Sequence, residues 1–390
     1  MNAQANPVSG VPVKVQLHDP DAVRPPSASR RGLERTLEGN SMKASDFSNG
    51  LPIEKESVVS ERPTEPFWCE NLLFALSDPK TDVGFWLHLG SIPNEWDIWE
   101  ERFVIALPGD EGLLSWIGYY HTPQERKPAG PGLAFKCIEP FRRWKVTFDG
   151  FATHVPTADM QNGLAKQGPH KRLVFDLDIE CTTPVWDAHM SAHGKGGKGE
   201  MVSQNWAKEH YEQMYFARGE MRVGDKTYPI NGSGWRDHSR GPRGGSGGEP
   251  FGGHVIAGAQ FPSGRAFIFS TYWRPDGKIT LEGGCVVDKD GTFHPAEVVA
   301  PPRVPTLQMS GEKIPVRLRW DAGQLETHIE TRRSIWFSMQ KTLPLGLLME
   351  GRGQTYVLNF GPVEWDGEVG EVYIERSDPF NEKPPEKIWS

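Results

Sequence analysis

A dense group of polar residues lies between Gly232 and Arg243, where the chain reads Gly-Ser-Gly-Trp-Arg-Asp-His-Ser-Arg-Gly-Pro-Arg. If this stretch is extended, successive side chains point to opposite faces. Such alternation separates one carboxyl group from the arginines beside it in the sequence. The two predicted faces are Trp235, Asp237 and Ser239 on one side, and Arg236, His238 and Arg240 on the other.

The separation bears on the acidity of Asp237. Burial of a carboxyl group without a neighbouring cation raises its pKa, so such a group can deliver a proton near neutral pH. Trp235, on the same face, can stabilise a developing cation through its ring by about 0.5–2 kcal/mol. The alternative is an ion pair between Asp237 and an arginine that only holds a turn. Arg236 and Arg243 are expected to be structural and to pin this loop.

A second polar cluster reads His210-Tyr211-Glu212-Gln213. In a strand, His210 and Glu212 share one face and the two residues between and after them share the other. Glu212, Tyr211 or His238 is therefore the candidate partner of the acid, as a base or as the group that positions water. The alternative is a solvated strand end.

Two histidines have the spacing of metal ligands on a helix, since His193 follows His189 by four residues. Met190 stands where an HExxH motif has its glutamate, and the flanking glycines and lysines favour a loop. A metal-dependent hydrolase or oxygenase would need further ligands, for which His210, Asp187 and Glu212 are the candidates. The better interpretation is solvated histidines, with no metal and no cofactor. The glycine-rich run 194–199 lacks the ending of a phosphate-binding loop.

Aromatic residues exceed what two small β cores need, with 14 Trp and 19 Phe in the chain. This excess predicts a large apolar pocket and a small hydrophobic ligand. The predicted substrate-binding residues are Trp86, His210, Trp235, Arg240 and Trp273.

Short apolar runs and frequent turn residues characterise the rest of the chain, whose 390 residues include 43 Gly and 33 Pro. In Arg172–Glu180, apolar residues alternate strictly with mostly polar ones, which is typical of a half-buried strand. We expect an all-β protein of two successive antiparallel barrels or sandwiches with few short helices. The predicted parts are an arm over 1–62 that is mobile or wraps the body, a first β domain over 63–200 and a second over 201–390. The second would carry the Arg-Asp-His-Ser motif, and residues 181–209, with a short helix from about 201, would connect the two.

Charge and composition exclude several partners. The net charge of −8 does not favour nucleic acid or anionic lipid, and no apolar run is long enough for a membrane span. Four widely spaced cysteines indicate buried thiols in a reducing compartment. The N-terminus lacks the apolar segment of a signal peptide, so we expect a cytoplasmic protein. The arm could also embrace a partner subunit, which leaves a homodimer open.

The two polar clusters together resemble a family. His-Tyr-Glu-Gln followed by Gly-x-Gly-x-Arg-Asp-His-Ser-x-Gly-x-Arg is similar to bacterial two-domain, lipocalin-like proteins related to carotenoid 1,2-hydratases of the hydroxyneurosporene synthase type. The resemblance covers residues 62–380. It implies tandem lipocalin-like barrels and an apolar ligand such as a terpenoid, a steroid or a polyene lipid. In the hydratase relatives an acidic residue protonates a double bond and water captures the cation without a cofactor. The motif match carries this role to Asp237, whereas Arg240 stands where the family commonly has tryptophan.

Two functions follow from these residues. The first is a cofactor-independent lyase or isomerase, of the hydratase or dehydratase kind, that acts on a hydrophobic terpenoid, steroid or aromatic substrate. The second is a carrier that binds an apolar ligand without chemistry. The environment of Asp237 distinguishes them: an apolar setting without an arginine favours the enzyme, and a bidentate ion pair with Arg236 or Arg243 favours the carrier.

Overall fold

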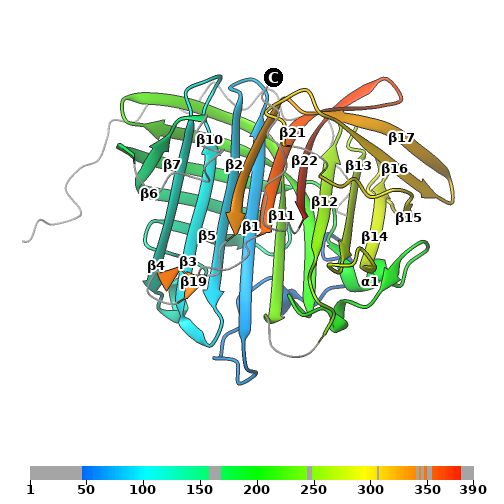
Figure 1. The fold of residues 1–390 in the computed structure, drawn as a ribbon, viewed down its shortest axis with the longest axis horizontal. Helices are drawn as coiled ribbons and strands as arrows, with labels where there is room; N and C mark the ends of the chain where they lie inside the picture. The colour runs from blue at the N-terminus through cyan, green and yellow to red at the C-terminus, as the bar shows by residue number, and fades with distance from the viewer. Residues whose placement is uncertain are drawn as a thin grey trace, which may run out of the picture. The chain divides into compact units, whose positions relative to one another are not determined.

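The protein is described by a computed structural model that covers residues 46–157, 168–243, 248–304, 307–339, 342–343, 347–348 and 354–378. Strands dominate it, and two antiparallel sheets each close into a barrel of eight strands (Figure 1). This confirms the predicted fold class of two tandem lipocalin-like barrels. The helices among the described residues are short: η1 (Ile53–Lys55), η2 (Gln124–Arg126), α1 (Ala188–Ala192) and η4 (Met201–Ser203).

The first barrel closes because β11 pairs with both β10 and β1. Two further strands, β5 (Leu133–Glu139) and β8 (Trp186–Asp187), pair with β6 and β10 outside the ring. In ring order its strands are β1 (Trp68–Asp78), β2 (Val83–Ile92), β3 (Glu95–Ala106), β4 (Leu113–His121), β6 (Arg143–Val155), β7 (His170–Cys181), β10 (Glu209–Val223) and β11 (Lys226–Pro242).

The second barrel closes because β13 pairs with both β12 and β14. Outside its ring, β9 (Lys198–Gly199) pairs with β14 and β18 (Arg333–Met339) with β21, while β19 (Thr342–Leu343) and β20 (Leu347–Leu348) pair with each other. In ring order its strands are β13 (Ala266–Trp273), β12 (Gly253–Gln260), β22 (Glu368–Asp378), β21 (Gln354–Trp365), β17 (Gly323–Glu330), β16 (Lys313–Trp320), β15 (Phe293–Val298) and β14 (Ile279–Val287).

The boundary between the barrels differs from the sequence prediction. Both β10 and β11 follow residue 200 but complete the first ring, so the change of barrel lies between Pro242 and Gly253. The motif strand β11 therefore belongs to the first barrel. The polar stretch 181–209 resembled a connection between domains. In the structure it leaves the first ring after β7, forms α1 and η4, and returns to the same ring at β10. The expected helix from residue 201 is limited to η4, since β10 begins at Glu209.

Three apolar clusters form the cores, and this explains the aromatic excess. One fills the first barrel, with Phe74 and Trp144 in it, and one fills the second, with Phe269 and Ile374. The third lies between the barrels and combines Leu73, Trp86 and Trp235 of the first with Ile268 and Tyr373 of the second. The strands that contact this third core are buried on both faces, so they read as nearly continuous apolar runs.

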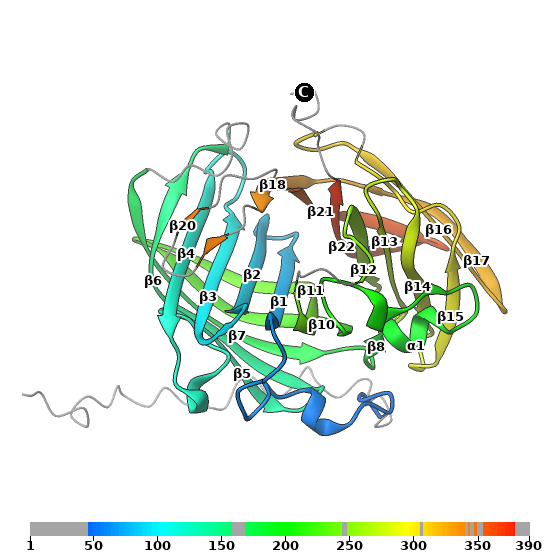
Figure 2. The ribbon, with the colours of Figure 1, turned by 60° about the horizontal axis from the view of Figure 1, so that its bottom comes forward.

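The segment from residue 46 to 62 packs against one end of the first barrel, where Figure 2 shows it in dark blue. Phe47 joins the core of that barrel, and the carboxylate of Glu56 is buried inside it. This part of the predicted arm therefore contacts the body, whereas residues 1–45 of the arm lie outside the described residues.

The four cysteines are free thiols, of which Cys137 is half-buried and the other three are buried. Among the helices that the structure describes, none has the length and apolar character needed to cross a lipid bilayer.

Candidate functional site

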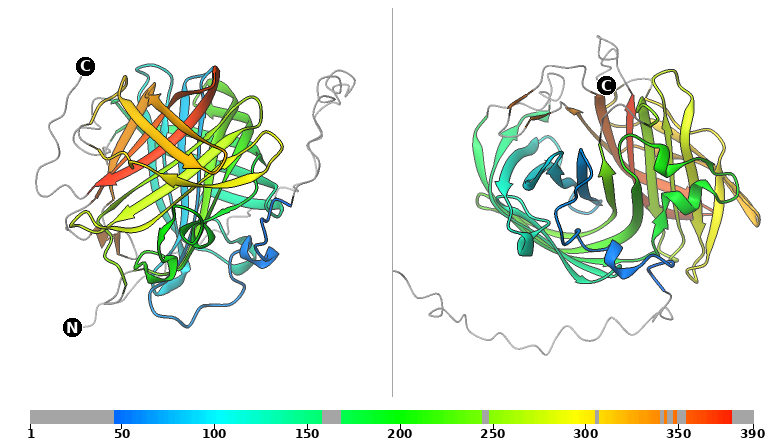
Figure 3. Two further views of the ribbon diagram at one scale, coloured as in Figure 1. Left: turned by 90° about the vertical axis from the view of Figure 1, so that its right-hand side faces the viewer. Right: turned by 90° about the horizontal axis from the view of Figure 1, so that it is seen from below.

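The β10–β11 hairpin positions most of the predicted site residues, and its two faces carry different chemistry. The strands pair so that Glu212 lies opposite Asp237 and Tyr211 opposite His238. Because facing residues of an antiparallel pair share one side of the sheet, each pair meets on a single face. The view down the first barrel in Figure 3 (right) shows how the ring curves around its interior, which one of these faces lines.

The interior face carries a buried polar chain. The Tyr211 hydroxyl lies 2.9 Å from Nδ1 of His238, and Nε2 of His238 lies 2.7 Å from the Glu70 carboxylate. Tyr211 also donates to Glu56, which forms an ion pair with Arg236 at 2.8 Å. These contacts engage Tyr211, His238, Glu70 and Glu56 inside the first barrel, and Nη1 of Arg236 is buried without a hydrogen-bond partner in the described structure.

Three predicted site residues therefore lie apart from Asp237. Tyr211 and His238, predicted to be catalytic, belong to the interior network. Arg240, predicted to bind substrate, donates to Glu209 at 2.7 Å and lies 3.6 Å from Glu70. The sheet itself separates these side chains from the opposite face, because alternate residues of a strand point to opposite sides.

The outer face of the hairpin holds Asp237, whose side chain is 15% exposed. Burial raises its pKa from 3.8 to about 7; the charges of His210 and Arg243 oppose this rise, and those of Glu212 and Glu375 add to it. Within the described part of the chain, no arginine forms an ion pair with Asp237. Arg236 is engaged on the interior face, and Arg243 donates to Ser239 at 2.8 Å. The carboxyl is thus poised between its two protonation states near neutral pH.

His210 and Glu212 lie on the same face as Asp237. Nε2 of His210 is 2.8 Å from Glu212, and Trp235 donates its indole N–H to the other oxygen of Glu212 at 2.7 Å. Burial raises the pKa of Glu212 well above its usual value and lowers that of His210. The second ring nitrogen of His210, Nδ1, is buried without a hydrogen-bond partner in the described structure and lies 3.9 Å from the Asp237 carboxyl.

The second barrel supplies an acid–histidine pair that the sequence analysis missed. Glu375 of β22 accepts hydrogen bonds from Trp86 at 3.0 Å and Tyr373 at 2.6 Å, and it lies 2.9 Å from Nε2 of His254. Burial opposes ionisation of Glu375, but the bonds from His254, Tyr373 and Trp86 outweigh it and lower its pKa. His254 is held from its other side by Ser377 at 2.7 Å.

Aromatic rings from both barrels surround these groups. Tyr272 of β13 stacks on Trp206 with ring centres 4.4 Å apart and on His254 at 5.5 Å. Its ring centre is 6.5 Å from that of His210, so it contacts both halves of the site. Trp235 stacks on Tyr373 across the barrels at 5.3 Å. We call this group the inter-barrel site; its members are Trp86, Trp206, His210, Glu212, Trp235, Asp237, His254, Tyr272, Tyr373 and Glu375.

Of the predicted substrate-binding residues, the structure brings Trp86, His210 and Trp235 to the inter-barrel site. Trp273 instead lies in the core of the second barrel, beneath the guanidinium of Arg303 at 3.7 Å. The sequence signal for the missed residues was a titratable side chain among apolar neighbours. Glu375 and His254 both lie in strands that are mostly buried. Which strands lie opposite the motif is a long-range property that these local patterns do not contain.

The arrangement separates the protonation states of two carboxyl groups. Asp237 has its pKa raised to about 7 by burial, whereas Glu375 is held ionised by its three donors. Carboxyl groups whose surroundings drive their pKa values apart are typical of acid–base catalysis. The site can therefore offer a proton from one carboxyl and a fixed negative charge from another, within a largely aromatic environment.

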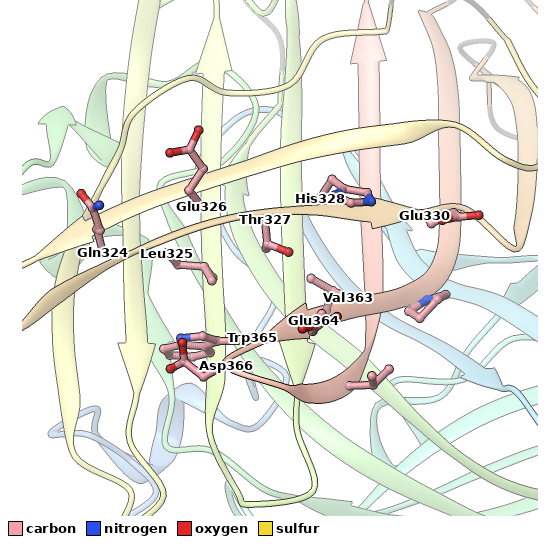
Figure 4. A pocket seen from close by; sticks show the side chains of 12 residues that line it. Gln324, Leu325, Glu326, Thr327, His328, Glu330, Val363, Glu364, Trp365 and Asp366 are labelled. Carbon is pink, nitrogen blue, oxygen red and sulfur yellow. The ribbon is translucent and has the colours of Figure 1, made fainter.

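A groove of about 600 Å³ lies elsewhere, on the second barrel, where β17 approaches the β21–β22 turn (Figure 4). The only pairing that the structure gives between β17 and β21 joins Ile329 and Val363. Its lining includes Glu326, Glu364 and Asp366, and none of the predicted site residues. The groove thus stands apart from the chemistry expected at Asp237.

Comparisons with known proteins identify the family and the fold. A family model described as "Domain of unknown function (DUF7064)" matches residues 55–379. No curated protein matches the sequence. A crystal structure from Nitrosomonas europaea, provisionally named AttH, is similar with a TM-score of 0.53 and 11% identity over 82% of this chain and 95% of that one. At this identity the likeness supports the barrel fold alone.

Two further solved structures are more distant. Kievitone hydratase from Nectria haematococca has a TM-score of 0.45 and 10% identity over 85% of this chain and 97% of its own. A structure named CghA has a TM-score of 0.47 and 10% identity over 88% of this chain and 98% of its own. Both scores are too low to support an argument about this chain.

Proposed function

Because the chain belongs to the DUF7064 family, whose description assigns no activity, we propose its function from the inter-barrel site itself. The protein is a cofactor-independent acid–base lyase or isomerase, of the hydratase or dehydratase kind. Its substrate is a hydrophobic molecule of the terpenoid, steroid or aromatic class. The resemblance of the two polar motifs to carotenoid hydratases agrees with this class of reaction.

One observation carries the proposal. A carboxyl with a pKa of about 7 and a buried, unpartnered imidazole nitrogen lie 3.9 Å apart, at Asp237 and His210. That separation is too long for a direct hydrogen bond, so a reacting atom or a water molecule is needed to join them. In the proposed reaction His210 donates its Nε2–H to Glu212 at 2.8 Å, so the lone pair is on Nδ1, which can accept a proton.

In the proposed reaction, protonated Asp237 delivers its proton to an alkene carbon or to a departing hydroxyl. The substrate becomes cation-like, and the ionised Glu375 and the rings of Trp235 and Tyr272 stabilise the positive charge. Nδ1 of His210 then takes a proton, either from an attacking water or from the carbon beside the cation. Starting from an alkene, the first outcome is hydration and the second is isomerisation. Starting from an alcohol, departure of water followed by loss of the carbon-bound proton is dehydration.

The experiment compares the wild type with Asp237→Asn, each purified from its own host and analysed by native mass spectrometry and lipid extraction. The variant is expected to retain an apolar metabolite. The wild type is expected to convert this metabolite to a product that differs in mass by one added or one lost water molecule, or to an isomer of it. With that metabolite as substrate, the variant should turn over about 10²–10⁴-fold more slowly. Asp178→Asn, which changes an exposed carboxylate on β7, is the matched control and should keep full activity.

The opposite outcome identifies the carrier. If the wild type and Asp237→Asn hold the same unchanged lipid with equal affinity, Asp237 has no part in chemistry and the proposal is wrong. In the proposed enzyme, activity also falls as the pH rises through about 7, since only the protonated form of Asp237 is an acid.

A further inference from the structure

Three potential metal ligands gather on the segment between β8 and η4. The short helix α1 begins after Asp187, whose carboxylate accepts from the backbone N–H of Met190 at 2.9 Å. The helix places His189 and His193 on one side, and the chain then turns back through β9 to Glu200. The ligand atoms of His189, His193 and Glu200 all lie within 4.8 Å of one another.

The hydrogen bonds of His193 fix which nitrogen is available. Nδ1 lies 2.9 Å from the carbonyl oxygen of His189 and must donate its proton there. In the neutral ring the lone pair is then on Nε2, which lies 3.0 Å from the Glu200 carboxylate. Two electron pairs facing each other require a cation, either a proton or a metal ion. A backbone carbonyl that orients an imidazole in this way is typical of histidines that bind metals.

The ring of His189 completes the cluster. Its centre lies 4.7 Å from that of His193, with the planes inclined by 65°. The two rings are therefore neighbours, and one ligand atom from each of them and one from Glu200 lie close enough together to bind a single ion. All three residues are exposed, so a water molecule can fill the remaining position of a four-coordinate ion.

The backbone holds this geometry without help from an ion. Gly199 of β9 pairs with Leu281 of β14, and Lys198 forms an ion pair with buried Glu282 at 2.5 Å. At Gly197 a Cβ atom would lie 2.3 Å from the carbonyl oxygen of Ser191, so only glycine lets the chain return this close to α1. Because the segment is already ordered, binding an ion costs little conformational entropy.

Neighbouring cations do not oppose an ion at the cluster. Lys198 is neutralised by Glu282, and Lys195 is neutralised by its ion pair with Asp321. Two imidazoles and one carboxylate suit zinc, nickel and copper, whereas magnesium and calcium prefer oxygen ligands alone.

We propose that His189, His193 and Glu200 form a binding site for a divalent transition-metal ion of the zinc type. The sequence pattern pointed away from a metal because the helix lacks the HExxH glutamate. The third ligand instead comes from seven residues after His193, and only the folded loop brings it close.

The ion would act as a clip rather than as a reagent. It joins α1 to the strand that leads through η4 to Trp206, which stacks on Tyr272 of the inter-barrel site at 4.4 Å. Bound metal stabilises the folded state by mass action, because the unfolded chain does not present the three ligands together.

The test is isothermal titration of the chelator-treated full chain with zinc chloride. The expected result is one ion bound per chain, with the affinity about tenfold or more weaker in His193→Ala and weaker also in Glu200→Gln. His121→Ala removes an exposed histidine of β4 and should leave the affinity unchanged. Magnesium chloride should produce no saturable heat.

A second measurement separates a built site from general surface binding. Zinc should raise the melting temperature of the wild type and of His121→Ala, but not of His189→Ala/His193→Ala. If all of these proteins bind zinc with the same affinity, the ion is adventitious and the assignment is overturned. These readouts do not depend on catalytic activity, so they stand apart from the proposed reaction.

Discussion

The protonation of Asp237 depends on which side chains the strand directs to the opposite face. Arg236 is its neighbour in sequence, but this arginine is buried on the interior face with Glu56 and Gln213. Asp237 faces the inter-barrel core, where Nδ1 of His210 lies 3.9 Å from its carboxyl. Because Arg236 and Asp237 are adjacent in the strand, they point to opposite faces. This alternation prevents an ion pair between them and leaves Asp237 able to hold a proton.

The raised pKa of Asp237 predicts a pH dependence of stability. Between its unfolded value of 3.8 and its folded value of about 7, the folded state holds a proton that the unfolded state has lost. The free energy of unfolding contributed by Asp237 therefore falls as the pH rises through this range. Asp237→Asn removes that contribution. From pH 5 to pH 8, the free energy of unfolding of the variant should therefore rise by more than about 1.4 kcal/mol relative to that of the wild type.

Urea denaturation at the two pH values measures this difference. Asp178→Asn, whose carboxylate is exposed, should follow the wild type at both. Parallel behaviour of Asp237→Asn and the wild type would show that Asp237 is solvated and has an ordinary pKa.

The two faces of the hairpin were predictable because strand alternation is local. The period of two placed Trp235 and Asp237 together, and Glu212 with His210, before any pairing was known. Glu375 was not predictable, since it lies more than a hundred residues away and reaches the site only through the contact between two barrels. Tyr211 and His238 were predicted to be catalytic, and they are adjacent in the sequence to Glu212 and Asp237. Adjacent residues of a strand point to opposite faces, so these two side chains lie inside the first barrel.

The interior face of the β10–β11 hairpin depends on hydrogen bonds to the segment 46–62. Glu56 enters the first barrel and accepts from Arg236 at 2.8 Å, from Trp144 at 2.9 Å and from the Phe141 backbone at 3.0 Å. It also accepts from Tyr211. One carboxylate thus satisfies four donors that belong to three different parts of the barrel.

Glu56→Ala is expected to destabilise the protein by about 3–5 kcal/mol, because it leaves Arg236 buried without a counter-charge. Chemical denaturation measures the loss. Glu54→Ala, two residues away and exposed, should change stability by less than about 0.5 kcal/mol. Equal effects of the two substitutions would contradict the role given to the buried ion pair.

The strands were largely predictable and their grouping into barrels was not. The predicted strand Arg172–Glu180 lies within β7. The division at residue 200 failed because a polar excursion from a barrel has the same composition as a linker. Ring closure depends on which strand pairs with β1, and the paired residues are more than 150 positions apart in the sequence.

The two barrels share a core, and Gly258 allows them to pack closely. A Cβ atom at Gly258 of β12 would lie 2.5 Å from Sδ of Met214 and 3.1 Å from Cδ1 of Trp235. Its absence lets β12 approach the outer face of the first barrel. Since the inter-barrel site draws on both barrels, neither alone contains it.

The shared core predicts that both barrels unfold in one transition. Ile268→Ala empties a fully buried position of the inter-barrel core and should cost about 2–5 kcal/mol. Tryptophan fluorescence and far-UV circular dichroism should give coincident midpoints in the wild type and shift together in the variant. Val369→Ala, at a 58% exposed position of β22, should leave the midpoint in place. Two separate transitions would show that the barrels are independent.

The double use of β11 has an evolutionary consequence. The even-numbered residues Arg236, His238 and Arg240 make contacts in the interior of the first barrel, whereas Trp235 and Asp237 belong to the inter-barrel site. In the proposed enzyme, substitutions at every second position of this single strand would therefore change the substrate site without rebuilding the scaffold. A fold organised in this way is suited to diversification. Substitutions that change the site would fall at every second codon of the gene segment that encodes β11.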